Sequence, residues 1–201
     1  HFGSCNFMGL HLRLNSNVLI PRPETEELVH WVISDVGESA SSIQDLGTGS
    51  GCIALALAQE LIGTEVLACD VSEEALQLAS SNAIELGLEV EFYKCDLLNE
   101  APKNAEVLVS NPPYIPNADK QQMASHVLEH EPHLALFVED DDPLLFYRRI
   151  AEFTADMNCR AYVEIHEAYK VELEKMLRNF GLSYEFKKDL HGKYRMLKWE
   201  R

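Results

Sequence analysis

Strand and helix patterns alternate over about 120 residues in the middle of the chain, and no other feature constrains the fold as strongly. The expected strands are short apolar stretches, and each is followed by a segment whose apolar residues fall on one helical face. Such alternation forms a mostly parallel sheet with helices on both faces, so the chain is predicted to have an α/β fold. We predict strands at 42–46, 65–70, 89–95, 106–110 and 160–165, and helices at 52–61, 72–86, 143–156 and 167–180.

Both ends of the chain add structure to this central pattern. Residues 7–20 alternate apolar and polar side chains around the sequence NSN, which predicts a β-hairpin, and residues 21–36 predict a helix. Near the C-terminus, two strands flank His191-Gly192 and extend the sheet to seven strands through an antiparallel hairpin. Residues 117–142 are expected to be partly helical.

The length of 201 residues suits one domain that can bury a substantial core. We expect residues 1–36 to be a β-hairpin and lead-in helix, what remains of a linker to a missing N-terminal domain. Residues 37–201 are expected to form the main domain, which we predict to be a monomer.

Composition narrows the classes of partner. The chain has 17 Lys and Arg against 33 Asp and Glu, a net charge of −16, which disfavours nucleic acid and favours a small molecule or a protein. No apolar run is long enough to span a membrane, and no signal peptide opens the chain. Five cysteines without CxxC spacing and scattered histidines predict a reduced, cytoplasmic protein that binds no metal.

In sheets of this kind, ligands bind beyond the carboxyl ends of the strands. After the first expected strand stands DLGTGSG, residues 45–51, in which Gly47, Thr48, Gly49, Ser50 and Gly51 form a tight turn that opens into a helix. Because glycine has no Cβ, a ligand can approach this backbone closely. The turn therefore predicts a site for a nucleotide-like ligand.

Acidic residues follow the next two strands. Asp70 stands where a carboxylate can hold ribose hydroxyls, about 20 residues after the glycine turn. Gly49, Gly51 and Ala54 also satisfy the dinucleotide pattern G-x-G-x-x-A, so a nicotinamide cofactor is an alternative. Asp96 follows the third strand and could accept a hydrogen bond from an adenine amino group, or cap the short segment that follows it; Leu97 would cover the ring.

The fourth strand ends in SNPPYI, residues 110–115. Pro112 and Pro113 have no N–H, and a residue before proline is held extended, so this corner is rich in hydrogen-bond acceptors and poor in donors. The side-chain oxygen of Asn111 is such an acceptor, and Tyr114 can supply a flat face. The corner suits a planar NH₂ group that donates two hydrogen bonds, and it offers nothing obvious for hydride transfer.

These motifs resemble a known family. DLGTGSGCIALALA, ACDVSEEAL and SNPPYI are similar to the class I methyltransferases that use S-adenosylmethionine and modify planar nitrogens. Together with VLIPRPETEELV, residues 18–29, they resemble the release factor glutamine methyltransferases, the HemK or PrmC family, over nearly the whole chain. The resemblance implies a Rossmann-like class I methyltransferase fold in residues 37–201. It also implies that a small helical domain of the family is missing from this chain.

By this resemblance, the protein transfers a methyl group from S-adenosylmethionine to the side-chain amide nitrogen of a glutamine in peptide chain release factors, leaving S-adenosylhomocysteine. The glycine turn would wrap the methionine part, Asp70 would hold the ribose, and Asp96 with Leu97 would border the adenine. Asn111 would contact both the cofactor and the substrate. The expected substrate-binding residues are Asn111, Pro112, Pro113 and Tyr114, and the expected catalytic residues are Asn111, Pro112 and Tyr114. Arg22, Glu24, Thr25 and Glu26 match the family motif without an assigned role.

Other functions stay open. A closely related glutamine methyltransferase could act on a ribosomal protein, and the NPPY sequence also occurs in adenine-specific DNA methyltransferases. The net charge of −16 argues against a DNA substrate. A non-catalytic cofactor-binding module is a further alternative, but it would have no use for an acceptor-lined corner.

Overall fold

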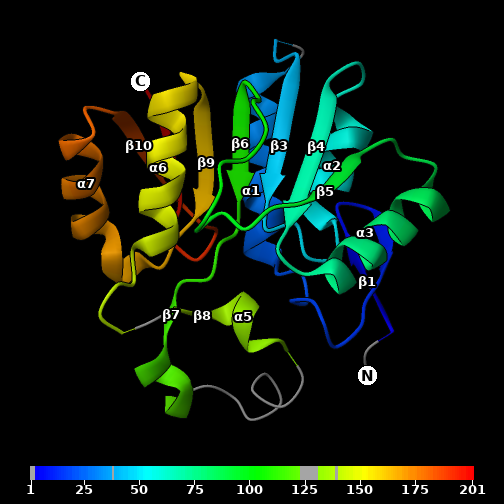
Figure 1. Cartoon of the computed structure of the whole chain (residues 1–201), viewed down its shortest axis with the longest axis horizontal. Coiled ribbons are helices and arrows are strands. Elements are labelled where there is room, and N and C mark those ends of the chain that lie inside the picture. Colours follow the sequence, from blue (N-terminus) through cyan, green and yellow to red (C-terminus); the bar gives the residue numbers. More distant parts are fainter. Residues whose placement is uncertain (1–2, 38, 123–130, 139) are drawn as a thin grey trace.

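A seven-stranded sheet forms the centre of the protein (Figure 1). The structure is a computed structural model that describes residues 3–37, 39–122, 131–138 and 140–201. Across the sheet the strands run in the order β10-β11-β9-β6-β3-β4-β5. They are β3 (Ser42–Leu46), β4 (Glu65–Asp70), β5 (Glu91–Lys94), β6 (Val107–Ser110), β9 (Arg160–Glu164), β10 (Ser183–Lys188) and β11 (Tyr194–Glu200). The five strands from β9 to β5 are parallel to one another, and β11 is antiparallel to both β9 and β10. The predicted mostly parallel sheet with a terminal hairpin is confirmed.

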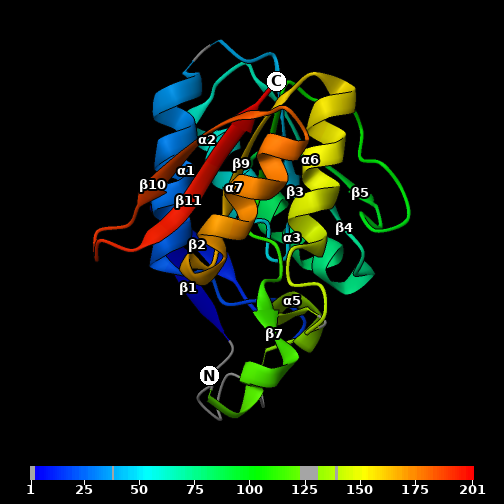
Figure 2. The same cartoon turned by 90° about the vertical axis from the view of Figure 1, so that its left-hand side faces the viewer.

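Helices cover both faces of the sheet, as Figure 2 shows with α1 on one side and α6 and α7 on the other. The helices α1, α2 and α3 contribute to one apolar cluster, and α6 and α7 contribute to the second. These helices are α1 (Pro23–Val36), α2 (Cys52–Glu60), α3 (Glu73–Leu86), α6 (Leu145–Met157) and α7 (Lys170–Asn179). The short 3₁₀ helix η2 (Glu167–Tyr169) leads into α7.

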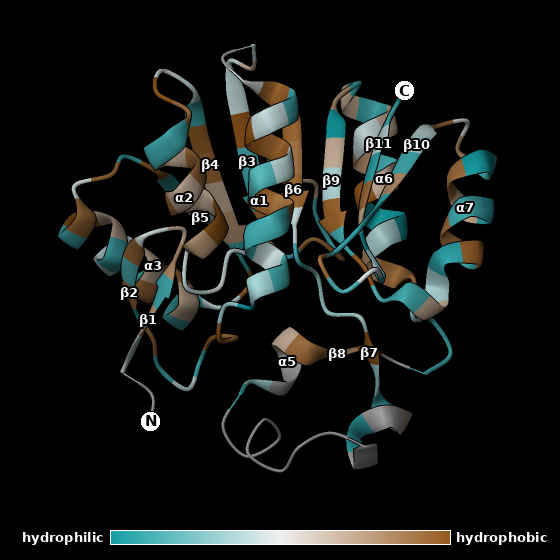
Figure 3. Cartoon of the chain, turned by 180° about the vertical axis from the view of Figure 1, so that it is seen from behind, coloured by the Kyte–Doolittle hydropathy of each residue, from teal (hydrophilic) through white to brown (hydrophobic). Residues whose placement is uncertain are grey.

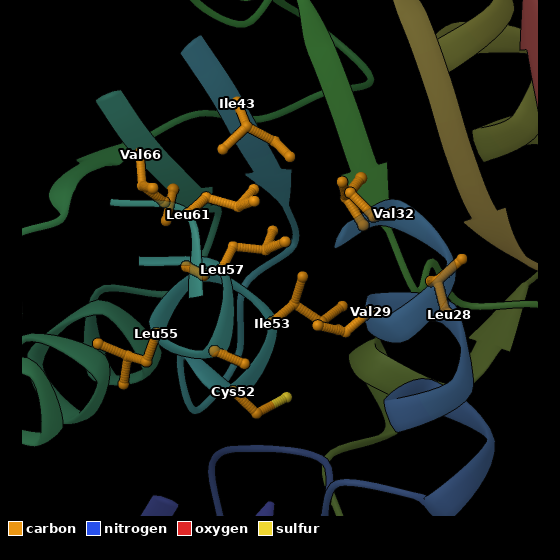
Figure 4. Packing of buried hydrophobic residues seen from close by; sticks show 14 of the residues in the cluster. Leu28, Val29, Val32, Ile43, Cys52, Ile53, Leu55, Leu57, Leu61 and Val66 are labelled. Atoms are coloured by element: carbon orange, nitrogen blue, oxygen red, sulfur yellow. The ribbon is translucent and has the colours of Figure 1, made fainter. Parts of the chain in front are cut away.

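The alternation of side chains along each strand separates the two clusters. Val107 and Val109 of β6 belong to one cluster, and Leu108 between them belongs to the other. Figure 3 shows brown segments gathered on central strands such as β4 and β6. In the first cluster, Ile53 of α2 and Val29 of α1 point toward each other (Figure 4). The central strands β3, β4, β6 and β9 are mostly buried on both faces, as expected for parallel strands between helices.

Helix ends follow the sequence signals. The Ser72 side chain accepts a hydrogen bond from the Ala75 amide at 3.2 Å, and two glutamates stand in the first turn of α3. The helix ends at Gly87, which is in the left-handed region. The first turn of α1 contains Pro23, whose missing N–H costs nothing at that position. These signals place α1 and α3 close to their predicted bounds.

The N-terminal hairpin was predicted with its turn in the wrong place. The strands β1 (Ser4–Phe7) and β2 (Leu10–Arg13) are joined at Met8-Gly9, with φ angles of 48° and 79°. Two consecutive residues with positive φ match the twist of a two-residue hairpin, and a glycine makes this turn accessible. The predicted turn residues instead form a local loop, in which Asn15 Oδ1 accepts a hydrogen bond from the Asn17 amide.

The region after β6 is partly helical, as predicted. It contains β7 (Ile115–Pro116), the 3₁₀ helix η1 (Asn117–Gln122), α5 (His133–Leu136) and β8 (Phe137–Val138). The rest of the predicted stretch, 123–130 and 139, lies outside the described residues. These elements lie beyond the carboxyl ends of the sheet strands, at the bottom of Figure 1. In the described part of the chain, no helix is long and apolar enough to cross a membrane.

Candidate functional site

A cavity of about 360 Å³ opens at the carboxyl ends of the central strands. It lies at the switch point of the sheet, because β4 and β6 flank β3 on opposite sides. Most of the predicted site residues line it, and they come from the ends of four elements. The lining includes Gly47, Thr48, Gly49, Ser50, Asp70, Asp96, Leu97, Asn111, Pro112 and Pro113. The volume is in the range of sites for small molecules and cofactors.

The glycine loop, residues 47–51, is held by backbone hydrogen bonds to the neighbouring strand. The amides of Gly47 and Thr48 both donate to the carbonyl of Cys69 at 2.9 Å. Gly51 has a φ of 84°, and a Cβ there would lie 3.1 Å from Ala79 Cβ. Only glycine fits this combination of positive φ and close approach to α3. The loop therefore places its backbone beside the cavity at the start of α2.

A buried acid, Asp45, holds the glycine loop through hydrogen bonds. Asp45 is fully buried, and its Oδ2 accepts hydrogen bonds from Thr48 Oγ1 at 2.6 Å and from the Ala54 amide at 3.3 Å. Its Oδ1 has no hydrogen-bond partner within the described residues. Burial raises the pKa of Asp45 to about 7. Because this carboxyl group accepts the hydrogen bond from Thr48, the protonation state of Asp45 is linked to the structure of the glycine loop.

Asp70 faces the cavity from the end of β4. Its Oδ2 accepts from the Gly49 amide and its Oδ1 from the Ser72 amide, both at 2.9 Å. A carboxylate oxygen can accept a second hydrogen bond, so each oxygen can still receive a ligand hydroxyl. Burial raises the pKa of Asp70, and these backbone donors oppose the rise. The geometry is compatible with the predicted contact to ribose.

Asp96 was expected either to contact an adenine or to cap the segment that follows it, and its position allows both. Its Oδ1 accepts from the Leu98 amide at 3.0 Å and its Oδ2 from Asn99 Nδ2 at 2.6 Å, so it caps the turn after β5. It also lines the cavity beside Leu97, whose carbonyl accepts from Arg149 Nε at 3.1 Å. Leu97 presents an apolar side chain that is 9% exposed. This end of the cavity is suited to a flat ring.

The acceptor corner, residues 111–114, follows β6. Asn111 Nδ2 donates to Thr25 Oγ1 at 3.2 Å, and Asn111 Oδ1 has no hydrogen-bond partner within the described residues. Thr25 also lines the cavity and is 2% exposed. Together with the two prolines, the corner offers a side-chain oxygen and no backbone N–H at Pro112 or Pro113.

Behind the corner lies a buried carboxylate that the sequence analysis did not select. Glu164, at the end of β9, is 1% exposed. Its Oε2 accepts from Thr25 Oγ1 at 2.7 Å, and its Oε1 accepts from the Tyr114 hydroxyl at 3.0 Å. Burial raises the pKa of Glu164, while both hydroxyl donors act to lower it. Tyr114 is directed to this carboxylate and does not line the cavity, unlike the other three residues of the corner.

The PRPETE motif, residues 21–26 of the segment VLIPRPETEELV, makes several contacts. Besides the contacts of Thr25, one guanidinium nitrogen of Arg22, Nη2, contacts both carboxylate oxygens of Glu131, at 2.7 Å from Oε1 and 2.9 Å from Oε2. Glu131 is 4% exposed, and its neighbour Pro132 lines the cavity. Glu26 Oε1 accepts from the Met8 amide at 2.9 Å, which ties the hairpin to α1. The motif thus links the N-terminal hairpin to the ends of β6 and β9 and to Glu131.

Sequence reasoning missed some of these residues for a physical reason. Glu131 contacts Arg22, 109 residues away, and Glu164 contacts Thr25, 139 residues away, and such distant pairs leave no periodic signal. A charged residue at the end of an apolar strand was the available signal for Glu164 in RAYVEI. Val18 and Phe146 also line the cavity, and their apolar side chains cannot be told from core residues in the sequence.

Among the described residues, no cluster of three or more His, Cys, Asp or Glu side chains could hold a metal ion. Asp70, Asp96 and Glu164 each accept hydrogen bonds from N–H or O–H donors of the protein.

Comparison with known proteins identifies the family. The family model of the methyltransferase small domain matches residues 26–136. The chain is 43% identical over 206 aligned residues to the release factor glutamine methyltransferase of Flavobacterium psychrophilum, covering 98% of this chain and 72% of that protein. It is 41% identical to the protein of the same name from Bacteroides thetaiotaomicron, covering 97% and 72%. The chain belongs to the release factor glutamine methyltransferase family.

Solved structures support the same fold. The catalytic domain of hMettl16 in complex with the MAT2A 3′UTR hairpin 6 matches with a TM-score of 0.74 at 19% identity, covering 96% of this chain and 76% of that one. The N-terminal domain of human METTL16 in complex with SAH matches with a TM-score of 0.66 at 20% identity, covering 96% and 76%. The predicted methyltransferase fold and family are therefore confirmed.

Proposed function

We propose that this protein transfers a methyl group from S-adenosylmethionine to the side-chain amide nitrogen of a glutamine in peptide chain release factors. The observation that carries the proposal is the acceptor corner at the cavity, where Asn111 Oδ1 has no hydrogen-bond partner among the residues that the structure describes. A primary carboxamide has two N–H donors and a planar face, and this corner complements both. The membership in the release factor glutamine methyltransferase family supports a glutamine as its source.

The other half of the cavity fits the methyl donor. Asp70 offers acceptors for two ribose hydroxyls, and Asp96 beside Leu97 offers an acceptor and an apolar wall for adenine. The glycine loop leaves room for the methionine part along its backbone. When bound there, S-adenosylmethionine supplies a methyl group that is already activated on a positively charged sulfur.

The task of the protein residues is mainly to orient the amide. An amide nitrogen is a poor nucleophile because its lone pair is delocalised into the carbonyl group. If Asn111 Oδ1 and the Pro112 carbonyl accept the two N–H groups, the amide plane is fixed and its face is turned toward the glycine loop. Such positioning can lower the activation free energy by roughly 7–11 kcal/mol. On transfer the nitrogen would bond to the methyl carbon while the bond from that carbon to sulfur breaks, S-adenosylhomocysteine would leave, and one N–H proton would pass to solvent.

The test uses the protein as it is, incubated with labelled S-adenosylmethionine, a purified release factor and, in parallel, purified ribosomal proteins and DNA. Mass spectrometry then locates the added methyl group. We expect one methylated glutamine in the release factor. Label in a ribosomal protein or in DNA instead, or no label in the release factor while the cofactor binds, would contradict the proposal.

A further inference from the structure

We propose that Thr25 and Glu164 are positioning residues that determine which way the Asn111 carboxamide faces. The inference rests on the proposed function, because it explains how the acceptor corner presents an oxygen to the substrate. Asparagine has two similar ends, an oxygen that accepts and an NH₂ group that donates. Only the oxygen end suits an incoming NH₂ group. Something in the protein must therefore select that orientation.

The selection begins at Glu164. Both carboxylate oxygens receive hydroxyl donors, from Thr25 at 2.7 Å and from Tyr114 at 3.0 Å. The carboxylate is 1% exposed, so solvent does not compete for these oxygens. Burial raises the pKa of Glu164 and the two hydroxyl donors act to lower it; in the carboxylate form that these donors favour, both oxygens only accept hydrogen bonds. The proton of the Thr25 hydroxyl is consequently committed to Glu164.

The single hydroxyl proton of Thr25 then decides the Asn111 orientation. With that proton used, the Thr25 oxygen has only lone pairs left for Asn111, 3.2 Å away. Asn111 must place its NH₂ group there, which turns Oδ1 away from Thr25 and toward the cavity. The reversed amide would set two acceptor oxygens against each other without a proton between them. It would also present donors to the donor groups of the substrate.

The position of Thr25 makes this arrangement possible. Pro23 begins α1, and the first turn brings Thr25 next to the ends of β6 and β9, which pair with each other in the sheet. The threonine thereby bridges Asn111, 86 residues away in sequence, and Glu164, 139 residues away. This gives the threonine of the PRPETE motif a role that its sequence context did not indicate. Tyr114 contributes through Glu164 rather than as a wall of the cavity.

Three variants test the selection directly. Thr25→Val keeps the shape but removes the hydroxyl, Thr25→Ser keeps the hydroxyl, and Glu164→Met removes both acceptor oxygens at similar size. At saturating cofactor and release factor, we expect Thr25→Val and Glu164→Met to lose at least about tenfold in turnover. Cofactor affinity, measured by calorimetry, should stay within about twofold, because the glycine loop and Asp70 are untouched. Thr25→Ser should recover most of the turnover.

A matched control is available in the core. Thr154 is fully buried, and its hydroxyl donates to the Ile150 carbonyl at 2.8 Å and accepts from Trp199 Nε1 at 3.0 Å. Thr154→Val removes a buried hydroxyl of a residue that does not line the cavity, so it should lower stability without lowering turnover. Wild-type turnover in Thr25→Val and Glu164→Met would overturn the inference.

A second readout does not depend on activity. The side-chain NH₂ resonances of Asn111, assigned by their loss in Asn111→Ala, report on the hydrogen bond to Thr25 in ¹⁵N NMR spectra. We expect them to shift in Thr25→Val and Glu164→Met but not in Thr25→Ser or Thr154→Val. Unshifted resonances in the first two variants would overturn the inference. A wild-type protein that methylates no release factor would overturn only the proposed function.

Discussion

The glycine loop and the acceptor corner face the same cavity, but the chain builds them in different ways. The loop is held by partners close in sequence, such as Asp45 three residues before Thr48 and Asp70 21 residues after Gly49. The corner is held by Thr25, which lies 86 residues from Asn111. One half is therefore a local motif of the backbone, and the other is a long-range arrangement of side chains. The comparison predicts that the two halves can be damaged separately.

Each half also contains a buried acid, and the two differ in their hydrogen bonds. Both oxygens of Glu164 receive a hydroxyl donor. Asp45 has one oxygen without a partner among the described residues, and burial raises its pKa to about 7. Burial raises the pKa of both acids, but only Glu164 has a donor from the described residues on each of its two oxygens.

The largest expected effect comes from breaking the corner at its centre. Asn111→Ala removes the side-chain acceptor, and we expect turnover at saturating cofactor to fall by about 10²–10³-fold, as for loss of one oriented hydrogen-bonding group in other active sites. Cofactor affinity should change by less than about threefold. Methyl incorporation and calorimetry measure the two quantities. Undiminished turnover would contradict the role of the corner.

The same contrast explains how much could be predicted from the sequence. The sheet, its helices and the glycine loop follow from patterns within short windows, such as the apolar strand before DLGTGSG and the cap at Ser72. Asn111 was selected because two prolines follow it directly. Glu164 and the bridging role of Thr25 could not be predicted, because they depend on which strands become neighbours in space. The hairpin turn was misplaced because NSN looks like a turn, while Met8-Gly9 has only one typical turn residue.

The pH dependence of the free energy of unfolding tests the raised pKa of Asp45. The pKa of Asp45 is raised by folding, so its contribution to stability is fully present below its unfolded pKa and is lost as pH rises through about 7. From pH 5 to pH 8, the free energy of unfolding should fall by roughly 3 kcal/mol through Asp45 alone. Urea unfolding of Asp45→Asn should show a flatter pH dependence than the wild type. Identical pH profiles would contradict the assigned pKa.

A backbone change should damage the loop and spare the corner. Gly51→Ala is strained by the φ of 84° and meets Ala79 Cβ at 3.1 Å. We expect it to lower the free energy of unfolding by about 2 kcal/mol and to weaken cofactor binding, with turnover restored when cofactor is saturating. Gly63→Ala is the control, because its φ of 90° carries similar strain but no atom lies within 4 Å of its added Cβ. Equal cofactor affinity in the two variants would contradict a special role for Gly51.

The smallest expected effect is at the ribose contact. Asp70→Asn keeps one acceptor oxygen and loses the negative charge, so we expect the cofactor dissociation constant to rise about tenfold. Turnover at saturating cofactor should change by less than about threefold. Calorimetry with S-adenosylhomocysteine measures the first quantity. A lower turnover with unchanged cofactor affinity would contradict the role of Asp70 in holding the cofactor.

The central claim is that the acceptor corner receives a carboxamide through the oxygen of Asn111. A crystal structure of the protein with S-adenosylhomocysteine and a glutamine-containing release factor peptide tests it most directly. The account predicts the glutamine side-chain nitrogen at about 2.9 Å from Asn111 Oδ1, with Asn111 Nδ2 still donating to Thr25. A glutamine side chain bound elsewhere in the cavity, or an Asn111 oxygen turned toward Thr25, would contradict it.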